Sequence, residues 1–214
     1  MLIRTTLAAC ATLVSALALA GPTNTENLDP KSDKPGLGAG DAAPAGLTLR
    51  TVDDQEVAIE TLWAEGPVVV TFYRGGWCPY CTKELRKWES NLEEVESLGA
   101  RFVAITMEKP DAAQKTIAKH AKGMRVLSDT TGDVSRAFRL AFALDAATTK
   151  KYKGYGIDLA TNNASGEWEL PAPGTFVIDA DGVVRYAWAD WDYTKRAPIE
   201  DVMGALRAVS AGPR

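Results

Sequence analysis

Residues 67–81 read Pro-Val-Val-Val-Thr-Phe-Tyr-Arg-Gly-Gly-Trp-Cys-Pro-Tyr-Cys, and this stretch decides the fold. Its first part, 67–72, is a β-branched apolar run, which predicts a strand buried on both faces of a sheet. Two glycines then turn the chain, and Cys78 stands where a helix is expected to begin. Pro79 suits the first helical position, because its missing N–H would have no partner there. Cys81 follows one helical turn later, so its sulfur can reach that of Cys78.

Strands and helices alternate along the rest of the chain, which predicts an α/β protein with a mixed central sheet and helices on both faces. Further strands are expected at 47–50, 56–59, 101–106, 125–127, 175–178 and 183–186, the last two as a hairpin. Helices are expected at 82–98, 111–122, 133–140 and 198–209. Residues 141–170 have weaker patterning, and we expect them to form a loop-rich insert that is either functional or a surface excursion.

The N-terminus has the composition of a secretory signal peptide over residues 1–20. Arg4 precedes an uncharged apolar stretch, which ends in the cleavage-like run Ala18-Leu19-Ala20 and falls short of the ~20 residues that span a membrane. We therefore expect an exported protein, periplasmic or extracellular, without stable membrane insertion. Cys10 lies too early in the apolar stretch to serve as a lipoprotein anchor. Residues 21–40 are expected to be a flexible leader before a domain at 41–210.

Composition and charge exclude several classes of function. The chain has 214 residues, which suffice for one domain. Its net charge of −4 gives no indication of the basic surface that binds nucleic acid. A CxxC pair can be half of a zinc site, but the chain has a single histidine, His120, in a lysine-flanked predicted helix. We therefore expect neither a metal nor another cofactor.

The Cys78–Cys81 pair closes too small a loop to serve stability, so thiol chemistry is the better explanation. The thiolate is the reactive form, and the N-terminus of a helix favours negative charge, which predicts a lowered pKa for Cys78. Arg74 either adds positive charge beside the thiolate or is an exposed loop residue. Trp77 either shields the thiolate and contacts a partner or has a packing role.

Residues 72–81 resemble the alkyl hydroperoxide reductase C/thiol-specific antioxidant (AhpC/TSA) family in its peroxiredoxin-like branch. The resemblance covers roughly 40–209 and includes the segments 40–44, 126–129, 175–179 and 192–196. It implies a thioredoxin-like fold, which agrees with the order of elements above. It also implies that Cys78 is the peroxidatic cysteine and Cys81 the resolving one.

The chain departs from the family pattern at two positions. Gly75 stands where peroxiredoxins typically have a threonine, and Pro173 stands where they have an arginine. Arg74 is the residue that could substitute for these groups. Pro173 instead resembles the cis-proline that faces the CxxC of thioredoxins. We expect Pro173 to shape the site together with Trp77, Pro79 and Thr175, while Thr71 occupies the position of the buried acid of thioredoxins.

Two activities follow from these features. The first is a thiol peroxidase that reduces a hydroperoxide through Cys78, forms a disulfide with Cys81 and is reduced again by a thioredoxin-like donor. The second is an exported thiol–disulfide oxidoreductase that acts on protein disulfides. A non-enzymatic binding domain is a third interpretation, since a fold does not imply a function. The sequence leaves a homodimer open and does not identify the donor.

Overall fold

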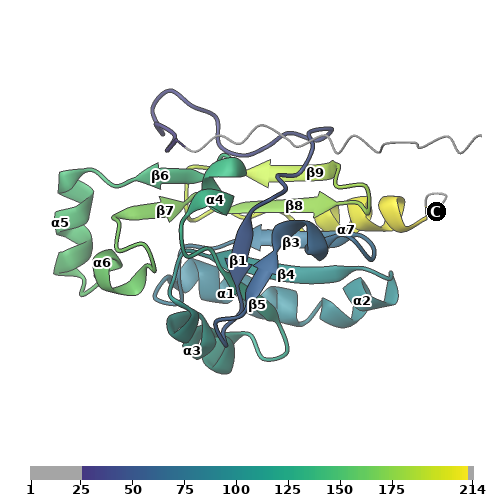
Figure 1. Ribbon diagram of the computed structural model, residues 1–214, viewed down its shortest axis with the longest axis horizontal. Helices are drawn as coiled ribbons and strands as arrows, with labels where there is room; N and C mark the ends of the chain where they lie inside the picture. Colours follow the sequence, from purple (N-terminus) through teal and green to yellow (C-terminus); the bar gives the residue numbers. More distant parts are fainter. Residues whose placement is uncertain (1–25, 212–214) are drawn as a thin grey trace, which may run out of the picture.

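The computed structural model describes residues 26–211, and a seven-stranded mixed sheet lies at its centre (Figure 1). The predicted signal peptide, Cys10 and residues 21–25 lie outside the described residues. The strands follow the order β2-β1-β5-β4-β3-β8-β9 across the sheet. Their bounds are β1 Thr48–Arg50, β2 Glu56–Ala58, β3 Val68–Phe72, β4 Arg101–Thr106, β5 Arg125–Ser128, β8 Gly174–Ile178 and β9 Val184–Ala189.

Strand β3 is the buried strand predicted from the apolar run, and all five of its residues are inaccessible to solvent. It runs parallel to β4, with Val68 opposite Arg101, and antiparallel to β8, with Phe72 opposite Gly174. Both of its edges are thus paired. The residues after Phe72 therefore leave the sheet at a fixed position, and this position determines where the cysteines lie.

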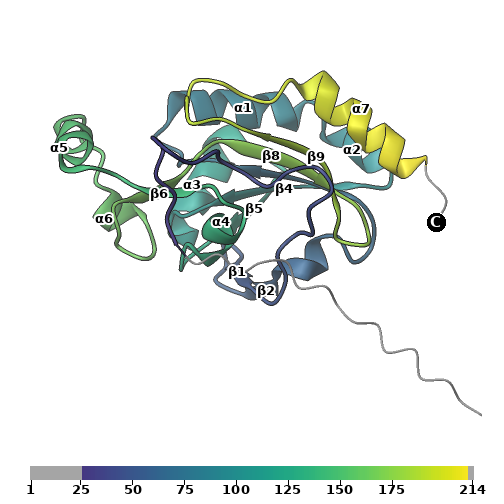
Figure 2. The same ribbon diagram turned by 90° about the horizontal axis from the view of Figure 1, so that it is seen from above.

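Helices cover both faces of the sheet, as Figure 2 shows for α1, α2 and α7 on one side and α4 on the other. Their bounds are α1 Pro79–Glu89, α2 Leu92–Ser97, α3 Pro110–His120, α4 Asp133–Ala137, α7 Ile199–Ser210 and a 3₁₀ helix at Ile59–Leu62. Within residues 26–211, no helix combines the length and the apolar character needed to cross a membrane.

Alternate residues of β3 enter two separate cores, because successive side chains of a strand point to opposite faces. Val70 and Phe72 join a core with Phe138 on the side of α4. Val69 joins a second core that also contains Cys78, Cys81, Leu85 and Trp88. The dithiol is therefore part of a hydrophobic core and does not lie on a surface loop.

The helix predicted at 82–98 is divided in two at Ser90 and Asn91. The Ser90 hydroxyl donates to the carbonyl of Arg86 (3.3 Å), and the Asn91 amide donates to that of Lys87 (2.7 Å). These side chains thus form hydrogen bonds to carbonyls near the end of α1 and compete with the backbone N–H groups that would continue the helix. The apolar periodicity persists across the break, which explains why the pattern predicted a single helix.

The insert at 141–170 is mostly regular structure, which corrects the expectation of a loop-rich segment. It consists of a two-stranded antiparallel sheet, β6 Ala141–Ala143 and β7 Glu169–Pro171, and two helices, α5 Ala146–Gly154 and α6 Leu159–Asn162. Asp145 caps α5 by accepting from the N–H of Thr148 (2.7 Å), and Asp158 caps α6 through Ala160 (3.1 Å). In Figure 1, α5 protrudes at one end of the domain.

The leader at 26–40 has no helix or strand, but it is packed along the domain, which corrects the prediction of a flexible segment. The N–H of Leu28 donates to the carbonyl of Ala141 (2.8 Å), and the N–H of Gly36 donates to that of Arg139 (2.7 Å). The indole of Trp191 donates to the carbonyl of Asp33 (2.8 Å). These residues are therefore part of the folded unit.

Replacing Phe138 by alanine tests the two-core arrangement. Phe138 is inaccessible to solvent, and its ring centroid lies 4.9 Å from that of Phe72 and 5.2 Å from that of Phe176. The substitution is expected to lower the free energy of unfolding by about 3–5 kcal/mol in a urea titration. Because Phe138 lies in the core across the sheet from Cys78, the pKa of Cys78 should not move; a large shift would contradict the separation of the two cores.

Candidate active site

The two cysteines lie at the N-terminus of α1, as the sequence predicts. Cys78 is the N-cap residue in an extended conformation, and Pro79 occupies the first turn. Both cysteines are free thiols, 2% exposed for Cys78 and inaccessible for Cys81. The chain reaches this position directly from β3, so the rigidity of the sheet fixes the first cysteine.

The two sulfurs form an asymmetric pair. A hydrogen bond from the Cys81 thiol is the largest cause that lowers the pKa of Cys78, to about 6, against the opposing effect of burial. The backbone N–H of Cys81 and the positive charges of Arg74 and Arg196 lower this pKa further. Burial and the neighbouring Cys78 raise the pKa of Cys81 well above its ordinary value. The negative charge of the reduced pair therefore resides on Cys78 and the proton on Cys81.

Arg74 is a buried cation and not an exposed loop residue. Its side chain is 3% exposed, and its guanidinium carbon lies 4.3 Å from the ring centroid of Tyr193, 5.2 Å from that of Trp77 and 5.5 Å from that of Tyr152. Burial lowers the pKa of Arg74, and the charges of Cys78 and Cys81 oppose this effect. Within the described part of the chain, its Nε has no hydrogen-bond partner. One donor of this cation is therefore buried and unsatisfied within the described residues.

Aromatic side chains surround Arg74 and form the rim of the site. Half-buried Trp77 meets Tyr152 edge-on at 5.8 Å between centroids, so helix α5 of the insert reaches the site. Tyr80 meets Tyr193 edge-on at 5.7 Å, and these two rings are 44% and 45% exposed. The packing role of Trp77 is thus confirmed by its contacts with Arg74 and Tyr152, and its contact with a partner stays a prediction.

Thr175 lies on β8, which pairs with β3, and Pro173 directly precedes this strand. Every described peptide bond is trans, so the resemblance of Pro173 to a cis-proline is wrong. The chain runs in extended form from β7 through Pro173 into β8, and the carbonyl of Pro173 accepts from the N–H of Asp190 (3.3 Å). The Thr175 hydroxyl lies 3.0 Å from that of Thr71, buried beneath the site. Thr175 thus supports the site from below without facing the rim.

Arg196 and Glu84 also belong to the site, although no motif in the sequence points to them. Arg196 donates through Nη2 to the sulfur of Cys81 (3.3 Å), and its Nε forms an ion pair with Glu84. Burial raises the pKa of Glu84 to about 7, against the opposing effect of Arg196 and of a hydrogen bond from Thr71. The resemblance of residues 192–196 to the family is the one signal in the sequence that includes Arg196.

Glu108 is a second buried carboxylate near the dithiol. Its Oε2 accepts from the N–H of Gly76 (3.0 Å), and burial raises its pKa to about 7. Gly75 stands beside it with φ of +152°, where a Cβ atom would overlap the indole of Trp77 and lie 2.8 Å from Glu108 Oε1. The family's threonine therefore does not fit at this position of the chain.

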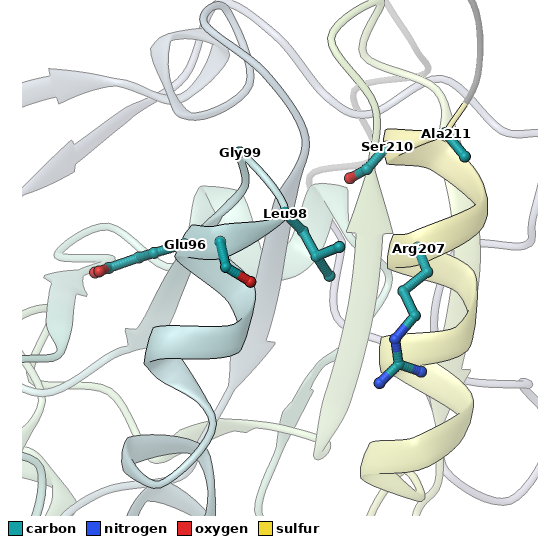
Figure 3. Close-up of a pocket in the computed structure, with 7 residues that line it drawn as sticks. Glu96, Leu98, Gly99, Arg207, Ser210 and Ala211 are labelled. Carbon is teal, nitrogen blue, oxygen red and sulfur yellow. The ribbon is translucent and has the colours of Figure 1, made fainter.

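Two further features lie outside the site. A pocket of about 460 Å³ between the ends of α2 and α7 is lined by Leu98 and Arg207, at the opposite end of the domain from α5 (Figures 1 and 3). His120 is half-buried, with its Nδ1 2.7 Å from Arg86 Nη2. Among residues 26–211, no group of three or more His, Cys, Asp or Glu side chains is arranged to hold a metal ion.

The titration of Cys78 is the first test of this electrostatic arrangement. The ultraviolet absorbance of the reduced protein should report one thiolate that forms as the pH rises through about 6. Cys81→Ala should raise this midpoint more than Arg74→Gln, because the hydrogen bond from Cys81 is the larger of the two causes. A midpoint near the ordinary value of ~8.5 in the unsubstituted protein would contradict the arrangement.

The fit of Gly75 gives a second test. Gly75→Ala is expected to destabilise the protein by about 1–3 kcal/mol, because the new Cβ meets Trp77 and Glu108 and the backbone is left-handed there. Thermal unfolding followed by circular dichroism measures this loss. Gly204→Ala is the matched control, since nothing lies within 4 Å of a Cβ at that position. Equal melting temperatures for the two variants would show that the Gly75 contacts are relieved without cost.

Comparisons with known proteins place this arrangement in a family. The sequence model of the AhpC/TSA family matches residues 39–187. A chloroplastic peroxiredoxin Q of Oryza sativa subsp. japonica is 28% identical over 149 residues, which make up 70% of this chain and 58% of that protein. The chain thus spans 58% of the length of this relative. Peroxiredoxin Bcp of Escherichia coli K12 is 25% identical over 155 residues, 72% of this chain and 87% of that protein.

Solved structures show the same fold. Peroxidoxin BcpB of Mycobacterium tuberculosis matches with a TM-score of 0.63 and 22% identity, over 81% of this chain and 98% of that one. A peroxiredoxin-like protein of Aquifex aeolicus matches with a TM-score of 0.64 and 19% identity, over 82% and 90%. The predicted thioredoxin-like fold is confirmed by these likenesses and by the mixed sheet described above. The family match covers more than half of the chain, and the chain therefore belongs to the AhpC/TSA family.

Proposed function

We propose that this protein is a thiol-dependent peroxidase that reduces hydroperoxides through Cys78. The observation that carries the proposal is the asymmetric dithiol, in which Cys78 holds the charge with a pKa of about 6 and Cys81 holds the proton. A thiolate that is present at neutral pH is the nucleophile that peroxide reduction needs. The relatives named peroxiredoxin Q and peroxiredoxin Bcp support the same activity.

In the first step, the Cys78 sulfur attacks one oxygen of the hydroperoxide. An S–O bond forms, the O–O bond breaks, and the departing oxygen takes a proton and leaves as an alcohol or as water. Arg74 is suited to stabilise the charge on the departing oxygen, because it is a buried cation next to Cys78 with an unpaired Nε in the described chain. Arg74 thus supplies the positive charge that the family obtains from the position of Pro173.

In the second step, Cys81 attacks the sulfenic acid on Cys78. An S–S bond forms, the S–O bond breaks, and the hydroxyl leaves as water with the proton of the Cys81 thiol. Since the Cys81 thiol already donates to the Cys78 sulfur in the reduced protein, the two atoms begin within reach of each other. A thioredoxin-like dithiol then reduces the disulfide. The signal-like residues 1–20 support an exported location for this cycle.

The disulfide oxidoreductase alternative was favoured by three features, Pro173, the CxxC and the signal-like N-terminus. The first of these is lost, because the bond before Pro173 is trans. The buried cysteines also leave little sulfur surface for a large disulfide substrate, since Cys78 is 2% exposed. We therefore keep hydroperoxide reduction as the proposed activity.

Rapid mixing with a hydroperoxide tests the proposal. The reduced protein should show a fast change in tryptophan fluorescence, because Trp77 adjoins Cys78, and consumption of peroxide should require a dithiol donor. Cys78→Ser should abolish both signals. Cys81→Ser should retain the first step and accumulate a sulfenic acid that a dimedone adduct reveals by mass spectrometry. Oxidation no faster than that of free cysteine, or full turnover by Cys81→Ser, would refute the scheme.

A further inference from the structure

Arg196 forms hydrogen bonds through Nη1 and Nη2, and its Nε lies beside a carboxylate in an ion pair that lacks hydrogen-bond geometry. Its Nε forms the ion pair with Glu84, and its Nη1 donates to the carbonyls of Tyr193 (2.8 Å) and Lys195. Its Nη2 donates to the sulfur of Cys81 (3.3 Å). The side chains of Arg196 and Glu84 are 16% and 6% exposed. The guanidinium is thus a fixed, largely buried donor directed at the second cysteine.

We infer that Arg196 activates Cys81 for attack on the oxidised Cys78, and that Glu84 is the positioning residue that holds Arg196 against the Cys81 sulfur. The inference rests on the proposed peroxidase function for the identity of the step. In this scheme Arg196 acts on the second cysteine in the resolving step, in addition to lowering the pKa of Cys78, whereas Arg74 acts on the departing oxygen in the first step. Both arginines, Arg74 and Arg196, lie outside the CxxC motif itself, residues 78–81.

Cys81 needs such a group because the second step must remove its proton in a buried place. The thiol is inaccessible to solvent, and burial disfavours its ionised form. Once Cys78 is a sulfenic acid, the neighbouring negative charge that also opposed ionisation of Cys81 is gone. An N–H donated to sulfur by a cation then favours the thiolate of Cys81, which forms the S–S bond while the Cys78 hydroxyl leaves as water with the released proton.

Glu84 is suited to the positioning role by its surroundings. It lies on α1, three residues after Cys81 and four before Trp88, and all three side chains are buried. Its carboxylate forms the ion pair with Arg196, and its side chain is 6% exposed. The helix that carries Cys81 therefore also places the carboxylate that holds Arg196.

The charge state of Glu84 sets a pH dependence for the second step. Burial raises the pKa of Glu84 to about 7, so the carboxylate is ionised above this pH and neutral below it. The ion pair with Arg196 is then present above about pH 7 and is lost as the pH falls. The other charged groups that face Arg196 are Cys78, Cys81 and Arg74. Disulfide formation should therefore slow below about pH 7, over and above any titration of Cys78 near 6.

Glu84→Gln tests the inference, with Glu169→Gln as a matched control. Glu169 is 3% exposed and pairs with Arg136, which is 16% exposed, so the control removes the same charge from a similar buried pair. Glu84→Gln is expected to slow disulfide formation about tenfold after mixing with peroxide. The rate is measured by stopping the reaction at set times and quantifying the free thiols that remain. Formation of the sulfenic acid should keep its rate at a pH above the pKa of Cys78. Glu169→Gln should change neither rate, and Arg196→Lys should slow the second step as Glu84→Gln does.

A second measurement separates this inference from the proposed function. In a Cys78→Ser background, the ultraviolet absorbance of the Cys81 thiolate can be titrated without any peroxide. Adding Glu84→Gln should raise the pKa of Cys81, and adding Glu169→Gln should not. If this shift is found while the unsubstituted protein reacts slowly with peroxide, the peroxidase function fails and the Arg196 contact stands.

Two outcomes would overturn the inference. The first is equal behaviour of Glu84→Gln and Glu169→Gln in both measurements, with circular dichroism confirming that both are folded. The second is faster disulfide formation in Glu84→Gln, which would mean that Glu84 only neutralises the charge of Arg196. The positioning role also predicts a pH signature. In Glu84→Gln, the rate of disulfide formation should no longer fall below about pH 7, whereas in Glu169→Gln it should still fall.

Discussion

A negatively charged sulfur inside a hydrophobic core is the constraint on which the rest of this site depends. Cys78 is 2% exposed, and burial alone would keep its thiol protonated. Its charge is supported by a thiol hydrogen bond and by two buried cations, Arg74 and Arg196. Each cation must itself be stabilised in the interior, Arg74 by three aromatic rings and Arg196 by Glu84. One buried charge thus accounts for most of the unusual side chains at this end of the domain.

The central part of the fold could be predicted because its signals are local. The run at 67–72 produces β3, and the bounds expected for the strand at 101–106 match β4. The insert at 141–170 was harder, because α5 has no buried residue and hence no apolar periodicity to detect. Its helix is defined instead by the cap at Asp145 and by contacts of a few side chains, among them Tyr152 with Trp77 and with Arg74.

The site could be predicted only as far as its residues are neighbours in sequence. Cys78, Pro79 and Cys81 lie where a helix start requires them. Arg196 is 115 residues from Cys81, and no pattern in the sequence reports that contact. Glu84 lies three residues after Cys81 and four before Trp88, on the buried face of α1, and only its partner Arg196 explains why a charged residue stands there. Pro173 was misinterpreted because its position alone does not determine the isomer of its peptide bond.

The two arginines differ in a way that corresponds to two different tasks. An arginine that meets a passing substrate must keep a donor free, since a donor already engaged would have to break a bond first. Arg74 has this property, with an unpaired Nε in the described chain and aromatic faces that hold the cation without using its N–H groups. An arginine that acts on a permanent protein group gains from being held in place, and Arg196 is held by two carbonyls at Nη1, by the Cys81 sulfur at Nη2 and by the Glu84 carboxylate beside Nε. The two cations also reach the site by different routes, because Arg74 directly precedes Gly75 in the segment that leads to Cys78, whereas Arg196 comes from a distant part of the chain.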